Sequence, residues 1–155
     1  IEEQVENYIF LQNYYPPGVP YDVFDTIKGR LEYQYSDDYT LKRTLLEGQV
    51  DCYFRVKKYD QPEIPSDILF KIKRRFEQQH PDEYFLQFSF IKEQVESYIF
   101  LQNYEPHRVP YRVLRTVKEQ LESEYPNDYL MQKAIIEKQI KSHLSLLKKT
   151  SPSDD

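Results

Sequence analysis

The sequence repeats itself with a fixed period of 45 residues. The stretch VENYIFLQNYYPPGVP, which starts at Val5, returns as VESYIFLQNYEPHRVP from Val95. A more divergent copy lies between them, so that one apolar position recurs without a slip as Val5, Val50, Val95 and Ile140. A catalytic site is normally assembled once, whereas helix pairs that cannot bury their apolar faces alone are stabilised by stacking against further copies. The repetition therefore predicts an architecture before it predicts any chemistry.

The period also limits the class of repeat. A repeat of 45 residues falls in the range of about 40–47 residues that is typical of two- or three-helix HEAT and armadillo units. The copies lack the diagnostic residues of tetratricopeptide and ankyrin repeats. We expect residues 1–149 to form a single all-α domain, a short right-handed solenoid or compact curved stack in this HEAT/armadillo-like class. Its parts would be a partial unit at 1–14 and repeats at 5–49, 50–94 and 95–139.

Each copy has the apolar spacing of two helices. A short helix at about residues 20–34 carries its apolar residues on one stripe. These are Val23, Phe24, Ile27 and Leu31. The proline that begins this helix in each copy suits the first turn, where a missing N–H costs nothing. These prolines are Pro20, Pro65 and Pro110.

A longer helix follows in each copy and crosses the repeat boundary. Its expected ranges are about 38–58, 83–103 and 128–148. We expect Asp37, Asp82 and Asn127 to cap these helices by accepting backbone N–H groups, with an acidic residue after each cap. With the helix at 1–14, the chain should hold about seven helices. The polar tail at 150–155 should be disordered.

Composition argues against several classes of protein. Cys52 is the only cysteine, so an internal disulfide is impossible, and a cytoplasmic location is the simplest interpretation. No apolar run approaches the roughly 18 residues that a membrane span requires, and the N-terminus lacks the features of a secretory signal. We therefore expect no membrane insertion. The net charge of −5 argues against general binding to nucleic acid.

The residue types that could support catalysis or metal binding are not arranged in the spacings that such sites require. His80, His107 and His143 stand in different columns of the repeat and are far apart in sequence. The carboxylate pair at Asp37 and Asp38 recurs in weakened form, which suits helix capping better than acid–base chemistry. There is no glycine-rich phosphate loop and no nucleophile elbow. We expect no enzyme activity, no metal and no cofactor.

Two sets of residues are candidates for binding a partner. The first is a ladder of tyrosines at helix ends beside proline-bearing loops, formed by Tyr14, Tyr59 and Tyr104. Tyrosine provides large, rigid contact area at low entropic cost, although tyrosines at helical spacing also serve as core residues. The second set consists of amides that recur beside this ladder and suit an extended peptide backbone, or else form a solvated helix face. These amides are Gln12, Asn13, Gln102 and Asn103.

The middle copy replaces the amides with cations. Together with cations of its short helix they form a candidate site for an acidic peptide, a phosphorylated segment or a nucleic-acid backbone. The candidate residues are Lys57, Lys58, Arg74 and Arg75. Acidic residues lie among them, so the local net charge is near zero.

The leading functional hypothesis is a non-catalytic protein-interaction or scaffolding module of a larger protein, which binds a peptide or protein partner on a repeat-built surface. The alternative is a structural spacer or a self-associating array segment. In that case the terminal helices would mediate contact, because the first unit is truncated and its apolar residues lack part of their packing partner. These residues are Ile1, Val5, Tyr8 and Ile9.

Overall fold

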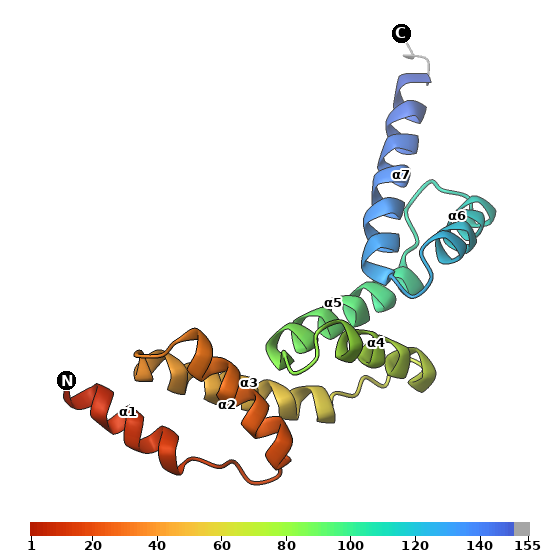
Figure 1. Ribbon diagram of the computed structural model, residues 1–155. Helices are drawn as coiled ribbons and strands as arrows, with labels where there is room; N and C mark the ends of the chain where they lie inside the picture. The colour runs from red at the N-terminus through yellow and green to blue at the C-terminus, as the bar shows by residue number, and fades with distance from the viewer. Residues whose placement is uncertain (151–155) are drawn as a thin grey trace. The chain divides into compact units, whose positions relative to one another are not determined.

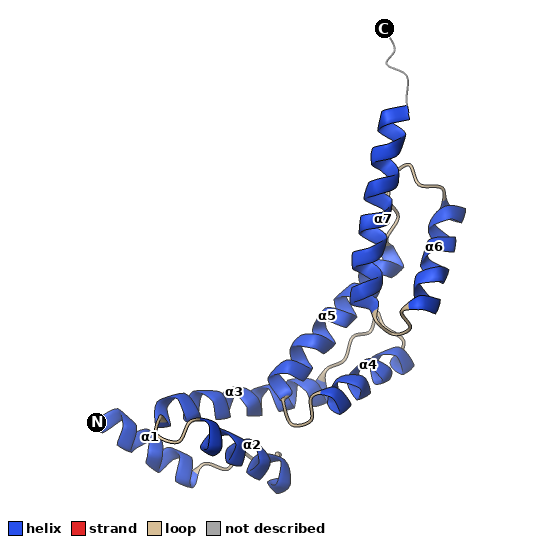
Figure 2. Ribbon diagram, turned by 45° about the horizontal axis from the view of Figure 1, so that its top comes forward, coloured by secondary structure: helices blue, strands red, loops and turns tan. Residues whose placement is uncertain are grey.

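The computed structural model describes residues 1–150, and within this range the chain is all-α, with seven helices and no strand (Figures 1 and 2). The predictions of an all-α chain and of about seven helices are thereby confirmed. The helices are α1 (Glu2–Asn13), α2 (Tyr21–Gln34), α3 (Tyr39–Lys58), α4 (Ser66–Gln79), α5 (Tyr84–Asn103), α6 (Tyr111–Glu124) and α7 (Tyr129–Thr150). Thr150, the first residue of the predicted tail, ends α7, and the rest of that tail lies outside the described residues.

From α2 onward, the helices alternate between short and long. The short helices α2, α4 and α6 begin at Tyr21, Ser66 and Tyr111, and the long helices α3, α5 and α7 begin at Tyr39, Tyr84 and Tyr129. Both series keep the 45-residue spacing of the sequence. The amphipathic patterns and turn residues thus predicted the helix bounds to within one or two residues.

Residue contacts divide the chain into two units. Unit 1 comprises residues 1–60 and 73–90, and unit 2 comprises residues 61–72 together with the described residues 91–150. In unit 1, α1 and α2 both pack against α3. The buried core of unit 1 contains Leu11, Val19, Phe24, Ile27, Leu31, Leu46, Val50, Cys52, Tyr53 and Tyr84. In unit 2, α6 packs against α7, and the buried apolar residues include Leu114, Leu121, Tyr129, Ile136 and Ile140.

The prolines stand one position before the helices rather than in their first turn. Pro20 and Pro110 are the N-cap residues of α2 and α6, with extended ψ angles of 143° and 135°. The carbonyl of Pro20 accepts the N–H of Phe24 at 3.0 Å and so begins the helical hydrogen-bond series. An N-cap residue needs only its carbonyl for this role, and proline's missing N–H is therefore harmless there.

The predicted capping residues of the long helices are also one position early. Asp38 is the N-cap of α3, and its Oδ1 accepts the N–H of Leu41 at 2.9 Å. Asp128 accepts the N–H of Met131 at 3.2 Å in the same way. Asp82 and Asn127 instead adopt left-handed conformations, with φ of 59° and 60°. Short polar side chains tolerate this region better than most, which explains their use in the turn.

A glutamine that lies two helices earlier in the chain supplies a further acceptor at the start of each long helix. Gln4 Oε1 accepts the N–H of Tyr39 at 2.9 Å, and Gln49 Oε1 accepts that of Phe85 at 3.3 Å. In unit 2, Gln94 Oε1 accepts the N–H of Tyr129 at 2.7 Å. Edge-to-face tyrosine pairs lie beside these contacts, with ring centroids 5.1–5.2 Å apart: Tyr8 with Tyr39, Tyr53 with Tyr84, and Tyr98 with Tyr129.

A lysine of each short helix stabilises the end of a preceding helix. Lys28 donates to the carbonyl of Leu11 at 2.8 Å, Lys73 to that of Tyr59 at 2.5 Å, and Lys118 to that of Leu101 at 2.6 Å. Cations are favourable at helix C-termini, where carbonyl groups lack intrahelical partners. Burial lowers the pKa of Lys73 and Lys118 from the usual lysine value.

A cation–aromatic contact recurs in all three copies, and in the middle copy the cation and the ring exchange positions. Arg43 lies over the ring of Phe10 at 3.9 Å, and Lys133 lies over Phe100 at 4.6 Å. At the same columns in the middle copy the cation is Arg55 and the ring is Phe88, 5.6 Å apart. The two positions therefore exchange residue types while the contact is kept, as expected for side chains that touch each other.

Candidate functional site

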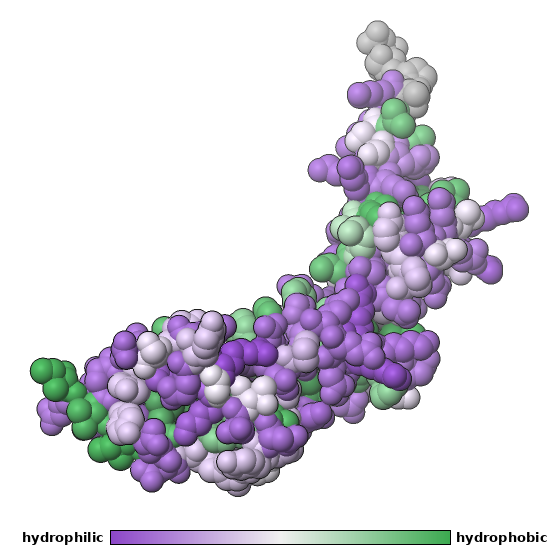
Figure 3. Space-filling model, viewed as in Figure 1, coloured by the Kyte–Doolittle hydropathy of each residue, from purple (hydrophilic) through white to green (hydrophobic). Residues whose placement is uncertain are grey.

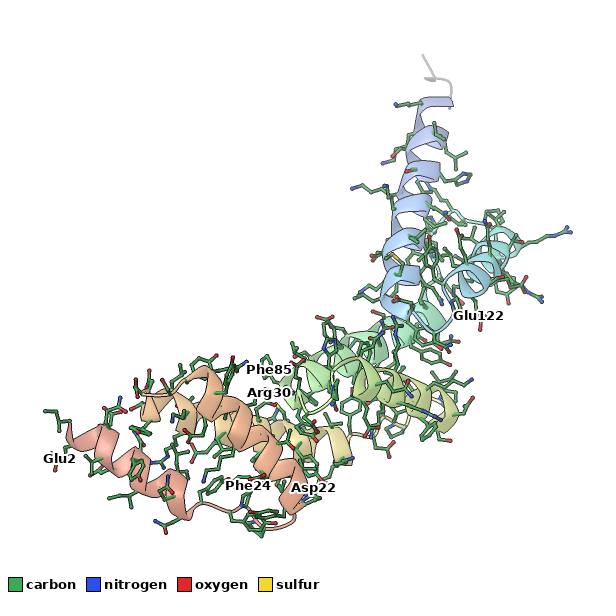
Figure 4. All side chains as sticks on the ribbon, viewed as in Figure 1. Glu2, Asp22, Phe24, Arg30, Phe85 and Glu122 are labelled. Atoms are coloured by element: carbon green, nitrogen blue, oxygen red, sulfur yellow. The ribbon has the colours of Figure 1, made fainter. Side chains whose placement is uncertain are left out.

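Unit 1 contains a cleft of about 380 Å³ bounded by α2, α3 and the start of α5. Its walls are apolar and its rim is polar. The apolar residues are Ile27, Leu31, Leu45, Phe85 and Leu86. Arg30, Gln34, Thr44, Gln49, Asp82 and Glu83 provide the polar groups. Arg30 lines the cleft from α2, and the exposed ring of Phe85 lines it from α5 (Figure 4).

Gly48 of α3 keeps the cleft open. A Cβ added at Gly48 would meet no atom within 4 Å. The next copy has Glu93 at this position, and it has Phe90 where the first copy has Leu45. The ring of Phe90 stacks against Phe76 and His80, with centroids 5.2 Å away in both cases. The smaller pair Leu45 and Gly48 therefore leaves a hollow in the first copy that a larger side chain occupies in the next.

Two of the three charged rim residues, Arg30 and Glu83, are paired with each other. Arg30 forms an ion pair with Glu83 at 3.3 Å, and Glu83 also lies 3.2 Å from His80 Nδ1. Asp82 accepts a hydrogen bond from the hydroxyl of Tyr84 at 3.4 Å. Burial, followed by the charge of Asp82, raises the pKa of Tyr84. The pairing of Arg30 with Glu83 reduces the free charge at the rim, which favours ligands that bind through apolar contact.

The predicted tyrosine ladder is half-buried against neighbouring rings. Tyr14 stacks on Phe10 at 4.7 Å, and Tyr104 stacks on Phe100 at 4.8 Å. Tyr59 meets Phe88 edge to face at 6.0 Å. Burial is the main cause that raises the pKa of Tyr14 and Tyr104. These rings thus have intramolecular packing, and their role in partner binding stays a prediction.

The predicted amides are exposed on their helices. Asn13 and Asn103 each donate to the carbonyl four residues earlier, at 2.8 and 2.9 Å. Gln12 is exposed near the end of α1. Gln102 lines a smaller cavity of about 160 Å³ in unit 2, together with Lys118 and Glu122, the last of which Figure 4 labels. The structure therefore brings Gln102 to a cavity.

The predicted cationic residues lie in unit 1, and three of the four approach aromatic rings. Lys57 lies 5.7 Å from the ring of Tyr53, and Lys58 lies 5.5 Å from that of Phe54. Arg75 lies 5.5 Å from Phe76. Arg74 is exposed on α4. An anion site at these residues remains a prediction.

The cleft itself was not among the predicted sites. Its one sequence signal is Gly48, a helix-interior glycine at a column that holds Glu93 and Lys138 in the other copies. Glycine in a helix interior is less favourable than alanine by about 1 kcal/mol, and a glycine at position 48 therefore indicates a packing or functional role. Among residues 1–150, no group of three or more His, Cys, Asp or Glu side chains is arranged to hold a metal ion. In the same range no helix has both the length and the apolar character needed to cross a membrane.

No family model, curated protein or solved structure matches the chain.

Proposed function

We propose that the chain is a non-catalytic protein-interaction module, built as a stack of tandem two-helix repeats, whose unit 1 cleft receives an apolar side chain of a peptide or protein partner. The observation that carries this proposal is the apolar cleft beside Gly48. The sequence repetition and the regular spacing of the helix starts support the repeat architecture. Such arrays commonly use their surfaces to bind partner segments.

The size and lining of the cleft suit a single anchoring side chain. Ligand sites usually measure about 300–1,000 Å³ and combine apolar walls with a few polar groups. At about 380 Å³, the cleft lies at the small end of that range. A leucine or phenylalanine that enters it would bury apolar surface worth about 1.5–3 kcal/mol. Binding energy at protein interfaces is concentrated in a few such anchors, and one well-seated side chain therefore contributes strongly.

The polar rim suits recognition of the peptide around that anchor. Gln34 and Thr44 present neutral hydrogen-bonding groups at the rim, while Arg30 and Glu83 neutralise each other's charge. Neutral donors and acceptors can bond a peptide backbone without selecting a charged side chain.

The test blocks the cleft with a larger side chain at Gly48 and measures peptide binding. A displayed library of random peptides is selected on the wild-type chain, and the selected peptides are then titrated against Gly48→Leu. We expect the peptides to share an apolar residue and to lose about tenfold or more in affinity for Gly48→Leu, because the new side chain occupies the anchor's position. Gly29→Leu on α2 is the matched control, since a Cβ there also meets no atom and Gly29 does not line the cleft. Equal binding to Gly48→Leu and Gly29→Leu would show that the peptides bind elsewhere.

A further inference from the structure

The short helices α2 and α6 carry opposite charges at matching positions of the repeat. The first and third copies are closely similar in sequence, and in just two of their columns an acidic residue in one copy stands against a basic residue in the other. These columns hold Asp22 with Arg112 and Asp25 with Arg115. Because the two columns lie three residues apart, they share one face of the helix. We call Asp22 and Asp25 the acidic face of α2, and Arg112 and Arg115 the basic face of α6.

Both faces are exposed to solvent. All four of their side chains belong to exposed residues, and Figure 4 labels Asp22 on α2. Figure 3 shows hydrophilic residues, in purple, projecting from α6 at the right of the view. The middle copy exposes Asp67 and Phe70 at the same columns of α4. Since these columns are exposed in all three copies, their exposure does not depend on the place of a copy along the chain.

The charges around the two faces preserve the difference between them. Arg115 also pairs with Glu119, at 2.8 Å, but Arg108 in the preceding loop is exposed and adds a further cation. Residues 108–119 hold four basic residues and one acidic residue, whereas the matching residues 18–29 hold one basic and two acidic residues. The start of α6 is therefore positive and the start of α2 is negative.

An exposed tyrosine stands beside each charged face. Tyr21 and Tyr111 occupy the column directly before the first charged position, and they are 71% and 73% exposed. The middle copy has Ser66 in this column. Tyrosine is enriched in protein interfaces, where its ring provides large contact area at low entropic cost. Each face thus combines a ring that can be buried in a contact with charges that can select the partner.

We propose that two copies of the chain associate through these faces, with the acidic face of α2 in one copy against the basic face of α6 in the other. A second copy is the partner because the chain itself supplies the complementary charges, at the same positions of equivalent helices. The contact is heterologous, so association either continues from copy to copy or closes into a ring. It involves neither α1 nor α7, and neither face lines the cleft. The association and the cleft are therefore independent of each other.

Two charge-reversed variants test the contact in the whole chain. The first combines Arg112→Asp with Arg115→Asp, and the second combines Asp22→Arg with Asp25→Arg. We expect sedimentation equilibrium to show reversible association of the wild type that weakens between about 50 mM and about 500 mM salt, because salt screens the attraction. In each variant the association constant should fall about tenfold or more, because faces of like charge then oppose each other. Circular dichroism checks that both variants keep their helicity.

An equimolar mixture of the two variants provides the specific test. Every copy of the first variant has two acidic faces, and every copy of the second has two basic faces. We therefore expect the mixture to associate to within about threefold of the wild type. Asp67→Arg combined with Glu77→Arg, at exposed positions of α4, is the matched control, since it changes the net charge as the second variant does. This control and Gly48→Leu should associate like the wild type.

Four results would overturn the proposal. The first is a wild-type chain that stays monomeric up to about 1 mM. The second is association that survives either charge reversal, and the third is a mixture of the two variants that stays monomeric. The fourth is an equal loss of association in the α4 control, which would assign the effect to net charge rather than to the two faces.

Discussion

At the scale of single residues, the side-chain amide of Gln94 makes three hydrogen bonds at the start of α7. Its oxygen accepts the N–H groups of Tyr129 and Leu130, at 2.7 and 3.3 Å, and its nitrogen donates to Asp128 at 3.0 Å. Gln94 is buried, so Gln94→Leu leaves these N–H groups without their side-chain acceptor. We expect the free energy of unfolding to fall by about 1–3 kcal/mol, measured by urea titration of helicity.

Gln139 provides the matched control for Gln94. It stands in the same column of the repeat but is exposed on α7. Gln139→Leu should change the free energy of unfolding by no more than about 0.5 kcal/mol. Similar losses in both variants would assign the effect to the change of helix surface rather than to the contact at the start of α7.

Single-residue roles were only partly predictable from the sequence. The glutamine column was visible, but an amide at fixed spacing does not reveal which helix start lies beside it. The cation–aromatic contact was more predictable than the glutamine contact. The pair Phe10 and Arg43 in the first copy becomes Arg55 and Phe88 in the second, so the ring and the cation exchange positions. Comparison of the aligned copies shows this exchange directly, and paired exchange is a sequence signal of contact.

At the scale of elements, the connections before α2 and α6 contain the same backbone feature with different residues. Gly18 has φ of 84°, and Arg108, in the same column, has φ of 69°. The left-handed region costs a residue with a Cβ about 1–2 kcal/mol, while glycine's greater freedom in the unfolded chain offsets about 0.5–1 kcal/mol. We expect Arg108→Gly to raise the free energy of unfolding by about 0.5–1 kcal/mol and Gly18→Ala to lower it similarly. Thermal and urea unfolding of both variants measure the two changes, and shifts of the same sign would contradict the shared conformation.

The elements themselves were the most predictable part of the molecule. Apolar spacing and proline positions are local properties, and the helix bounds followed from them. The turn before each long helix was less predictable, because Asp82 and Asn127 can either cap a helix or adopt a left-handed conformation. Only the position of the next hydrogen-bond donor decides between these roles, and this depends on the folded geometry.

At the scale of the whole molecule, burial raises the pKa of several acidic groups in both units. These are the thiol of Cys52 and the hydroxyls of Tyr14, Tyr84, Tyr98, Tyr104 and Tyr129. A raised pKa means that the folded state holds a proton that the unfolded state releases. Stability is then full below the unfolded pKa and declines as the pH rises through it towards the folded value.

Tyr84→Phe isolates one of these contributions, since it keeps the ring and removes the hydroxyl. We expect the unfolding free energy of the wild type to fall more steeply than that of Tyr84→Phe above about pH 10, by up to roughly 1.4 kcal/mol per pH unit. The lowered pKa values of Lys73 and Lys118 make the unfolding free energy rise with pH, in the opposite direction. This contribution is common to the wild type and Tyr84→Phe, so it does not affect the comparison. Urea titrations from about pH 9 to pH 11 make the comparison. Parallel curves would contradict a raised pKa at Tyr84.

The candidate site was the least predictable feature at this scale. A cleft arises from the volumes of side chains that meet from different helices, and here the small pair of Leu45 and Gly48 decides it. The sequence shows that Gly48 is unusual in its column but does not show which neighbours would leave the space empty.

The glutamine contact at each long-helix start has a consequence for how such a chain can change in length. Gln4, Gln49 and Gln94 each bond the first turn of a helix that begins 35 residues later, and they follow one another every 45 residues. A genetic duplication or deletion of one whole period brings an equivalent glutamine to every remaining helix start. An insertion of another length within a long helix rotates the amide away from its helix start or shifts it along the helix axis. Lineages that carry this chain should therefore gain and lose residues in multiples of the period, with other length changes confined to the loops.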